Sequence, residues 1–404
     1  MMPIGWTPTI TGKRKGKAIE LIRYVADELE KQMLFQDTSL HVGQAGFSIF
    51  WEYYHRYSKN GIYQIRSQSA INSALASITN KPLPFTFCNG VTGILWTYSH
   101  LEEMGAVKLN LDEIISDDVE DFIIAWSKSR LTFEDYDYLH GSLGACLYLL
   151  NRINKDNAKK ALEESINLLN EIAHVFPEGI TWKWTDPITG MDGYNLGLSH
   201  GMPSIIILLS RILQAGVAPK VTYNLLKKSI EWVLDKKNET NFSCFPTAIN
   251  ETDNQYSRLG WCYGDLGIAM SFIQAGLNAN NDTWIKEGTN IALHSSHRRN
   301  LDQNGVRDAG LCHGSAGIAH IYNRLFHYTG ETELKSSSEY WFEKTFSFFD
   351  SINNLKAYRI NPDTKEGYWD EEYGILEGLA GIGLALISGI STVEPRWDRS
   401  LLLS

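Results

Sequence analysis

Several features are scarce in this 404-residue sequence, and each absence excludes a class of protein. Five cysteines make an odd number, so a complete disulfide framework is excluded. The first residues lack the charged-then-apolar pattern of a secretory signal. The most apolar long stretch, residues 375–390, contains an acidic residue and is too short to span a bilayer. We therefore expect a cytoplasmic protein of a reducing compartment.

Basic residues are also in the minority. The chain has 37 Lys and Arg against 47 Asp and Glu, a net charge of −10, and binding to phosphate needs a basic face. Nucleic acid is therefore not the expected partner. With 43% hydrophobic residues, the composition is that of an ordinary globular protein, and a chain of this length folds without help from a metal. A metal site would therefore serve chemistry.

A glycine pattern recurs along the whole chain. A glycine, two residues, a second small residue and an apolar run appear together, and successive copies are 47 to 64 residues apart. This spacing is the length of two helices with their connections. The repeats begin at Gly43, Gly90, Gly141, Gly201, Gly264, Gly314 and Gly378.

The runs after these glycines are apolar on nearly every side, which is typical of interior helices. Amphipathic segments such as 158–172 and 222–234 lie between them and predict outer helices. No repeat looks like a polar cap, so we predict a closed all-α fold, an α/α toroid of seven helical hairpins in two layers. We expect a single domain over residues 1–404, with an N-terminal arm at about 1–16 and loops or short β-hairpins on one rim at about 174–197 and 355–373.

Reactive side chains collect just before the first glycines, at the expected N-termini of the inner helices. Cys262, Cys312 and His313 occupy this register in neighbouring repeats. Two thiolates and an imidazole suit Zn²⁺, and three protein ligands leave a fourth position open for chemistry. The alternative is two ordinary buried cysteines and a core histidine.

The remaining cysteines are interpreted as structural, Cys88 within this register and the other two outside it. Cys88, Cys146 and Cys244 are predicted to pack as small core residues. His140 shares the register with His200 and His313 and is a possible pocket-lining residue.

The motifs Trp-Cys-Tyr-Gly at 261–264, Leu-Cys-His-Gly-Ser-Ala-Gly at 311–317 and Gly-Leu-Ser-His-Gly at 197–201 resemble those of the lanthionine synthetase C family. With the repeats, the resemblance covers essentially the whole chain. It implies a single-domain α/α toroid with one zinc ion. It also implies a cyclase that closes thioether rings in a ribosomal precursor peptide after a dehydratase has acted.

The resemblance assigns roles to seven residues. It implies that the zinc ligands are Cys262, Cys312 and His313, and that the catalytic pocket residues are His200, Asp137, Arg258 and Tyr263. Among them, His200 matches the acid/base. Tyr263 favours the bacterial peptide cyclases over the eukaryotic relatives.

The expected reaction is an intramolecular Michael-type addition of a peptide cysteine to dehydroalanine or dehydrobutyrine, which gives lanthionine or methyllanthionine. It needs a thiolate, whereas a free thiol with a pKa near 8.5 is mostly protonated at neutral pH. His200 would protonate the α-carbon. Asp137 would take the thiol proton or orient His200, and Arg258 or a helix N-terminus would stabilise the enolate.

Other functions stay open. One is transfer of glutathione or another thiol, as in the eukaryotic branch of the family. A second is a zinc-containing scaffold that binds a peptide without reacting. A prenyltransferase-like toroid is disfavoured because it would use Asp, Cys and His as zinc ligands.

The expected substrate is a dehydrated precursor peptide with leader and core. The family implies further partners, a dehydratase and an exporter, which would hold the protein at the inner face of the membrane. The chain itself is expected to be a monomer.

Overall fold

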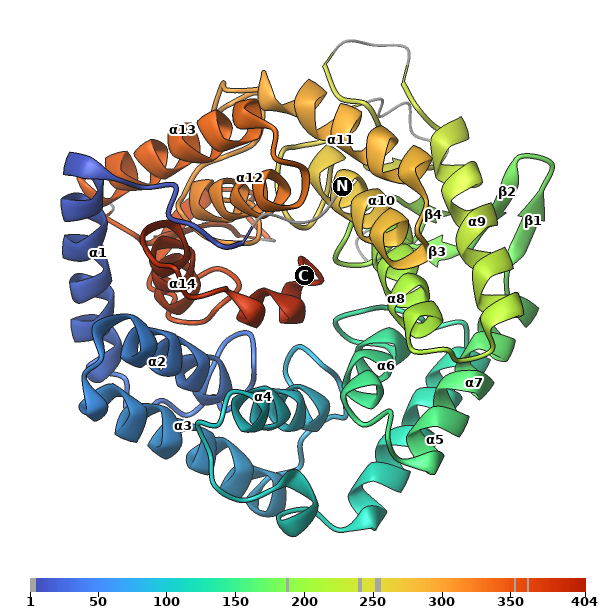
Figure 1. Cartoon of the computed structure of the whole chain (residues 1–404), viewed down its shortest axis with the longest axis horizontal. Helices are drawn as coiled ribbons and strands as arrows, with labels where there is room; N and C mark the ends of the chain where they lie inside the picture. The colour runs from blue at the N-terminus through green and yellow to red at the C-terminus, as the bar shows by residue number, and fades with distance from the viewer. Residues whose placement is uncertain (1–4, 187–188, 239–241, 251–255, 352–353, 362) are drawn as a thin grey trace. The chain divides into compact units, whose positions relative to one another are not determined.

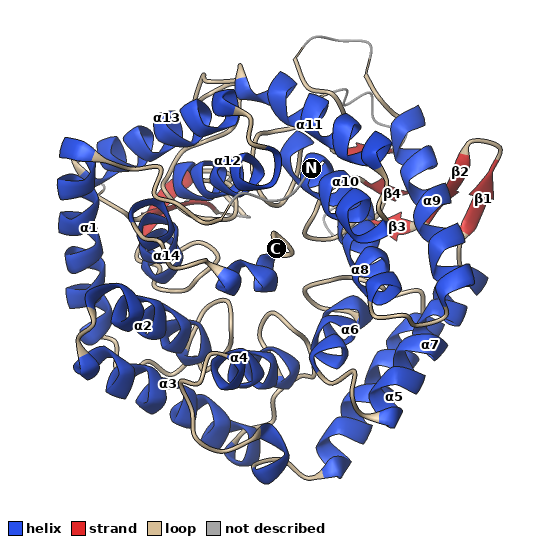
Figure 2. Ribbon diagram, in the orientation of Figure 1, coloured by secondary structure: helices blue, strands red, loops and turns tan. Residues whose placement is uncertain are grey.

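The structure is a computed structural model that describes residues 5–186, 189–238, 242–250, 256–351, 354–361 and 363–404. It divides into two compact units. The first comprises residues 1–84, 89–110 and 299–404, and the second comprises residues 85–88 and 111–298. Helix dominates both units, and the strands are short (Figure 2). The predicted all-α class is therefore confirmed.

In the first unit, the buried helices begin directly after a first glycine of the repeats. Each takes that glycine as its N-cap, and in the last of them every residue is buried. They are α2 (Gln44–Ser58), α4 (Val91–Glu103), α12 (Ser315–Thr329) and α14 (Leu379–Ile390). The prediction that these runs are interior helices is confirmed.

Amphipathic helices cover them. Helix α3 (Gly61–Asn80) packs on α2, and α13 (Thr332–Phe349) packs on α12. Helix α1 (Gly12–Glu30) packs on α14, although the two come from opposite ends of the chain (Figure 1). The last glycine repeat therefore receives its outer helix from the N-terminus.

This pairing corrects the predicted N-terminal arm. Helix α1 begins inside residues 1–16, and Thr9 and Ile10 are 2% and 1% exposed. Their N–H groups donate to the carbonyl of Gly389 at 3.0 and 2.8 Å. Residues 1–4 of the arm lie outside the described residues. Thr9 and Ile10 therefore attach the chain just before α1 to α14, whereas residues 11–16 stay exposed.

The second unit follows the same pattern. Its inner helices begin after Gly141, Gly201 and Gly264, and they are α6 (Ser142–Asn151), α8 (Met202–Gln214) and α10 (Asp265–Ala279). The outer ones are α5 (Asp117–Thr132), α7 (Asp156–Glu171), α9 (Pro219–Asp235) and α11 (Asp282–Ser296). Helices α7 and α9 confirm the outer helices predicted over 158–172 and 222–234.

Six of the seven described strands lie within the two ranges predicted to hold loops or hairpins, and β5, which pairs with β4, lies outside them. In the second unit β1 pairs with β2, and β3, β4 and β5 form one antiparallel sheet. In the first unit β6 pairs with β7. Their bounds are β1 (His174–Phe176), β2 (Gly179–Thr181), β3 (Trp184–Thr185), β4 (Asp192–Asn195), β5 (Ala248–Ile249), β6 (Ala357–Ile360) and β7 (Gly367–Asp370), and the 3-10 helices are η1 (Leu111–Glu113) and η2 (Arg396–Leu401).

A side-chain turn precedes several inner helices. The residue six positions before the first glycine accepts the backbone N–H two residues later through its Oδ1, at 2.7 to 3.2 Å. Asp and Asn make this turn readily because their side chains mimic a backbone carbonyl. The residues are Asp37, Asp135, Asn195 and Asp308. The turn fixes the loop that carries the candidate site residues.

The second glycine of a repeat is needed for close packing. A Cβ at Gly317 would overlap the carbonyl of Leu311. At Gly264 the first glycine also has φ +105°, a conformation that favours glycine. The glycine pattern therefore reflects the tight loop at the start of each inner helix.

Candidate active site

A hydrogen-bonded histidine and aspartate lie in the loops that precede α8 and α6. Nδ1 of His200 is 2.5 Å from Oδ2 of Asp137, and the two side chains are 29% and 21% exposed. The other oxygen of Asp137, Oδ1, accepts the backbone N–H groups of Leu139 and His140, both at 2.8 Å. The carboxylate is thus held in place by its own loop.

The two groups shift each other's protonation. Burial disfavours the charged carboxylate, but the hydrogen bond and charge of His200 outweigh it and lower the pKa of Asp137. Burial likewise disfavours the imidazolium, but the hydrogen bond and charge of Asp137 raise the pKa of His200. The pair therefore favours a protonated imidazole beside a carboxylate.

Tyr263 lies close to this pair. Its loop is joined to the His200 loop because the N–H and hydroxyl of Ser199 both donate to the carbonyl of Cys262, at 3.4 and 3.2 Å. The amide Nδ2 of Asn195 donates to the Tyr263 hydroxyl at 3.3 Å. Burial raises the pKa of Tyr263, so its hydroxyl keeps its proton.

These side chains share a cavity of about 590 Å³. Asp137, His200 and Tyr263 line it together with His140, whose ring stacks on that of His200 with centroids 6.3 Å apart and planes at 15°. The prediction of His140 as a pocket-lining residue is confirmed. Such a volume is typical of sites that enclose a small ligand.

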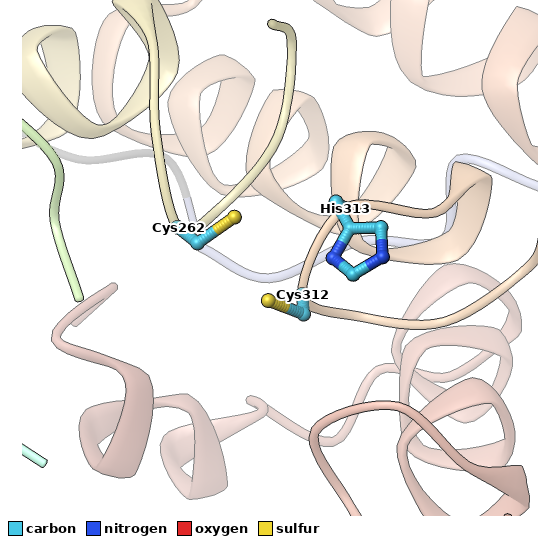
Figure 3. Close-up of side chains that lie close together, drawn as sticks. All are labelled: Cys262, Cys312 and His313. Atoms are coloured by element: carbon cyan, nitrogen blue, oxygen red, sulfur yellow. The ribbon is translucent and has the colours of Figure 1, made fainter. Parts of the chain in front are cut away.

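Cys262, Cys312 and His313 lie just before α10 and α12, as the repeat register predicted. Their two sulfurs and one imidazole nitrogen all lie within 4.8 Å of one another (Figure 3). Ligand atoms around a tetrahedral zinc ion are about 3.3 to 3.8 Å apart, given bonds of about 2.0 to 2.3 Å. The residues therefore fit Zn²⁺, and the two cysteines, 8% and 9% exposed, are largely shielded from water.

A second cluster in the second unit does not fit a metal. Cys244, Asp265 and His294 also have ligand atoms within 4.8 Å. However, Asp265 already holds the buried Arg298 at 3.2 Å and accepts two backbone N–H groups. Burial and the charge of Asp265 raise the pKa of the Cys244 thiol to about 12. The cluster fixes the loop before α10.

The remaining cysteines are accounted for as well. Cys146 is fully buried and Cys244 is 5% exposed, as expected of core residues. Cys88 is half-buried, and its N–H donates to the Leu139 carbonyl at 3.0 Å.

Arg258 does not occupy the position expected of it. Its side chain is exposed, and it is absent from the described residues that line the cavity. It stands six residues before Gly264, where other repeats have the aspartate or asparagine of the side-chain turn. A Cβ added at Gly264 would overlap the Arg258 carbonyl oxygen, so the backbone at Arg258 passes close to that glycine.

Some residues that line the cavity or hold its side chains in place escaped the sequence analysis. Asn195 would have been found from its position six residues before Gly201. Phe133 and Trp184 line the cavity from outside the repeat register, so no local signal marks them. Within the described ranges, no helix has both the length and the apolar composition needed to cross a membrane.

Comparisons with known proteins agree with this arrangement. The sequence model of the lanthionine synthetase C-like protein family matches residues 35–402. The nisin biosynthesis protein NisC of Lactococcus lactis subsp. lactis is 24% identical over 398 residues, which cover 91% of this chain and 90% of that protein. A solved structure of nisin cyclase matches with a TM-score of 0.74 at 18% identity, over 95% of this chain and 96% of that one. This likeness confirms the predicted fold class, the α/α toroid.

Proposed function

The chain belongs to the lanthionine synthetase C-like family, and on that premise we propose that it is a zinc-dependent cyclase. It adds cysteine thiols of a dehydrated peptide to dehydroalanine or dehydrobutyrine and so forms lanthionine or methyllanthionine rings. The similarity to nisin cyclase and to NisC supports a peptide substrate of this class. The observation that carries the proposal is the His200–Asp137 pair on the wall of the cavity.

Cys262, Cys312 and His313 would hold one zinc ion. When bound, the ion supplies a Lewis acid that keeps a substrate thiol deprotonated at neutral pH. The thiolates of Cys262 and Cys312 would cancel most of the charge of the ion, which would leave the sulfur of a substrate thiol nucleophilic. The absence of a carboxylate from the ligand set suits activation of a thiol better than activation of water.

His200 acts on the dehydro residue that accepts the thiol. When the substrate sulfur bonds to the β-carbon, negative charge develops on the carbonyl oxygen of the dehydro residue, and the α-carbon must then gain a proton. The raised pKa of His200 keeps a proton on its ring, and Asp137 fixes Nδ1 so that Nε2 is the atom that delivers it. The proton lost by the substrate thiol balances the one delivered.

Tyr263 is assigned to the developing oxyanion. Its hydroxyl stays protonated, and Asn195 holds it in place, so it can donate to the carbonyl oxygen. A donor of this kind is often worth about 3 kcal/mol in the transition state. We assign Arg258, which is exposed, to contact with the peptide at the surface.

The test is ring closure on a dehydrated, cysteine-containing peptide, followed by mass spectrometry with a thiol-blocking reagent. Closure leaves the mass unchanged but removes the blockable thiol. The wild-type protein should remove it, and His200→Ala should do so about 10² to 10⁴ times more slowly while still binding the peptide. Undiminished closure by His200→Ala would refute the role of His200, and binding without closure by the wild type would indicate a scaffold.

The same assay distinguishes thiol transfer. With glutathione present, a transferase would add its mass to the dehydrated peptide, whereas a cyclase would leave the mass constant. We propose the dehydrated precursor peptide as the partner on which the protein acts, and a dehydratase as the enzyme that supplies it.

A further inference from the structure

The cavity beside His200 extends beyond the groups that the proposed chemistry uses. Its volume of about 590 Å³ is far larger than one dehydroalanine residue requires. Besides His200, Asp137 and Tyr263, its lining includes Phe133, Trp184 and Thr185. These residues come from the turn after α5 and from strand β3, two segments of the same unit.

Phe133 is presented to solvent by a braced turn. Its side chain is 76% exposed, which is unusual for phenylalanine. The next residue, Glu134, has φ +59°, in the left-handed region that costs free energy for a residue with a side chain. An ion pair between Arg130 and Asp135 spans the turn, and the N–H of Asp135 donates to the Arg130 carbonyl at 2.9 Å. The turn therefore holds an apolar ring at the cavity in spite of strain.

Trp184 is held in place by the pairing of β3 with β4. It is half-buried in β3 and pairs with Gly193 of β4. On either side of it, Lys183 forms an ion pair with Asp192 at 2.8 Å, and the Thr185 hydroxyl donates to the same carboxylate at 2.7 Å. Two aromatic side chains thus line one cavity from separately fixed segments.

We propose that Phe133 and Trp184 form a specificity subsite that binds an apolar side chain of the peptide next to its dehydro residue. Rigid aromatic rings bury a large area at little cost in side-chain entropy. Successive residues of an extended peptide are about 3.3 to 3.6 Å apart, so a neighbour of the residue at His200 stays within the same cavity. The inference rests on the proposed function for the reaction, but binding tests it separately.

The experiment measures binding of two fluorescent peptides by anisotropy. Both contain dehydroalanine and have serine in place of cysteine, so neither can close a ring. One has leucine beside the dehydroalanine and the other has glycine. The wild type should bind the leucine peptide about tenfold more tightly, and Phe133→Ala should lose this preference without weaker binding of the glycine peptide.

Phe122→Ala is the matched control. Phe122 lies in α5, is 63% exposed and does not line the cavity, so this variant should keep the preference. Trp184→Phe should keep part of it, because an aromatic ring remains. Equal binding of both peptides by the wild type, or an equal loss for both in Phe133→Ala, would overturn the proposal.

A parallel assay separates this inference from the proposed function. The glycine peptide with its cysteine restored should be cyclised equally well by the wild type and by the control Phe122→Ala. If the wild type bound the leucine peptide preferentially but closed no ring, the subsite would stand and the cyclase function would fail. If it closed rings without any preference, the subsite alone would fail.

Discussion

Two histidine–aspartate pairs in this protein have similar geometry and opposite environments. In the second unit, His200 and Asp137 are 2.5 Å apart and border the cavity. In the first unit, His320 and Asp398 are 2.9 Å apart and only 1% and 0% exposed. Arg324 also contacts both oxygens of Asp398. The surroundings, rather than the pair itself, therefore decide what each pair can do.

The pKa shifts of the two histidines reflect this difference. Burial outweighs Asp398 and lowers the pKa of His320, so its ring is neutral. At the cavity Asp137 prevails, and the pKa of His200 is raised. The positive charge of the neighbouring Arg324 lowers the pKa of His320 further and offsets part of the effect of Asp398. The His320–Asp398 pair joins η2 to α12, whereas the His200–Asp137 pair can donate a proton.

The largest expected effect is on stability in the first unit. Asp398→Asn removes the charge that balances the buried Arg324, which should cost about 3–5 kcal/mol of unfolding free energy. Chemical denaturation measures this loss. The control, Asp137→Asn, should cost much less because its pair is partly exposed. Equal losses in the two variants would contradict the contrast between the pairs.

The rate of ring closure should show the reverse order, with Asp137→Asn more impaired than Asp398→Asn. Asp137→Asn should slow ring closure about 10² to 10⁴-fold, because His200 loses the partner that holds its tautomer and its proton. Single-turnover ring closure at a temperature where all variants are folded is the measurement. A folded Asp398→Asn protein should close rings at nearly the wild-type rate. If Asp398→Asn closed rings as slowly as Asp137→Asn, the His320–Asp398 pair would not be purely structural.

A smaller effect is expected where the site loops touch. A Cβ at Gly197 would lie 2.5 Å from both the Cys262 carbonyl and the Tyr263 ring, so Gly197→Ala must displace one of them. We expect a loss of about 1–3 kcal/mol in unfolding free energy and slower ring closure.

Gly16→Ala provides the control for this change. Gly16 lies in α1 with nothing within 4 Å of an added Cβ. Replacing it should stabilise the protein by up to about 1 kcal/mol and leave activity unchanged. If Gly197→Ala behaved in the same way, the close contact between the two loops would be refuted.

The smallest effect is a pH dependence. The contribution of His200 to stability is full below its unfolded pKa and is lost as pH rises through its raised folded pKa. The contribution of Asp137 is present above its unfolded pKa and is lost as pH falls through its lowered one. As pH rises above neutrality, His200 loses its proton. The stabilisation by the pair and the rate of proton donation by His200 should therefore both fall.

NMR titration of the His200 ring checks this prediction. Its pKa should fall in Asp137→Asn, because the hydrogen bond and the charge that raise it are weakened. The neutral His320 should show no corresponding change. An unchanged His200 titration would mean that Asp137 does not control its protonation.

Much of this arrangement could be predicted because it is encoded locally. The glycine pairs mark the start of each inner helix, and the register before them brings out Cys262, Cys312 and His313. The same register also identifies His200, which directly precedes the first glycine of its repeat. The glycine pattern recurs every 47 to 64 residues, so its copies support one another.

What escaped prediction depends on contacts distant in sequence. Nothing in residues 12–30 shows that they pack on α14 at the other end of the chain. The exposure of the Arg258 side chain depends on how its loop folds, which the neighbouring residues in the sequence do not show. Phe133 and Trp184 reach the cavity from a helix end and a short strand, and their roles depend on three-dimensional placement alone.

The central claim is that two cysteines and one histidine hold the zinc ion at which a peptide thiol is activated. Zinc-edge X-ray absorption on the purified protein tests it most directly. The account predicts one zinc per chain with two sulfur neighbours at about 2.3 Å and one imidazole nitrogen at about 2.0 Å, plus a light-atom ligand. A third sulfur should join when a cysteine peptide is added. Protein that binds no zinc, or zinc without sulfur neighbours, would contradict it.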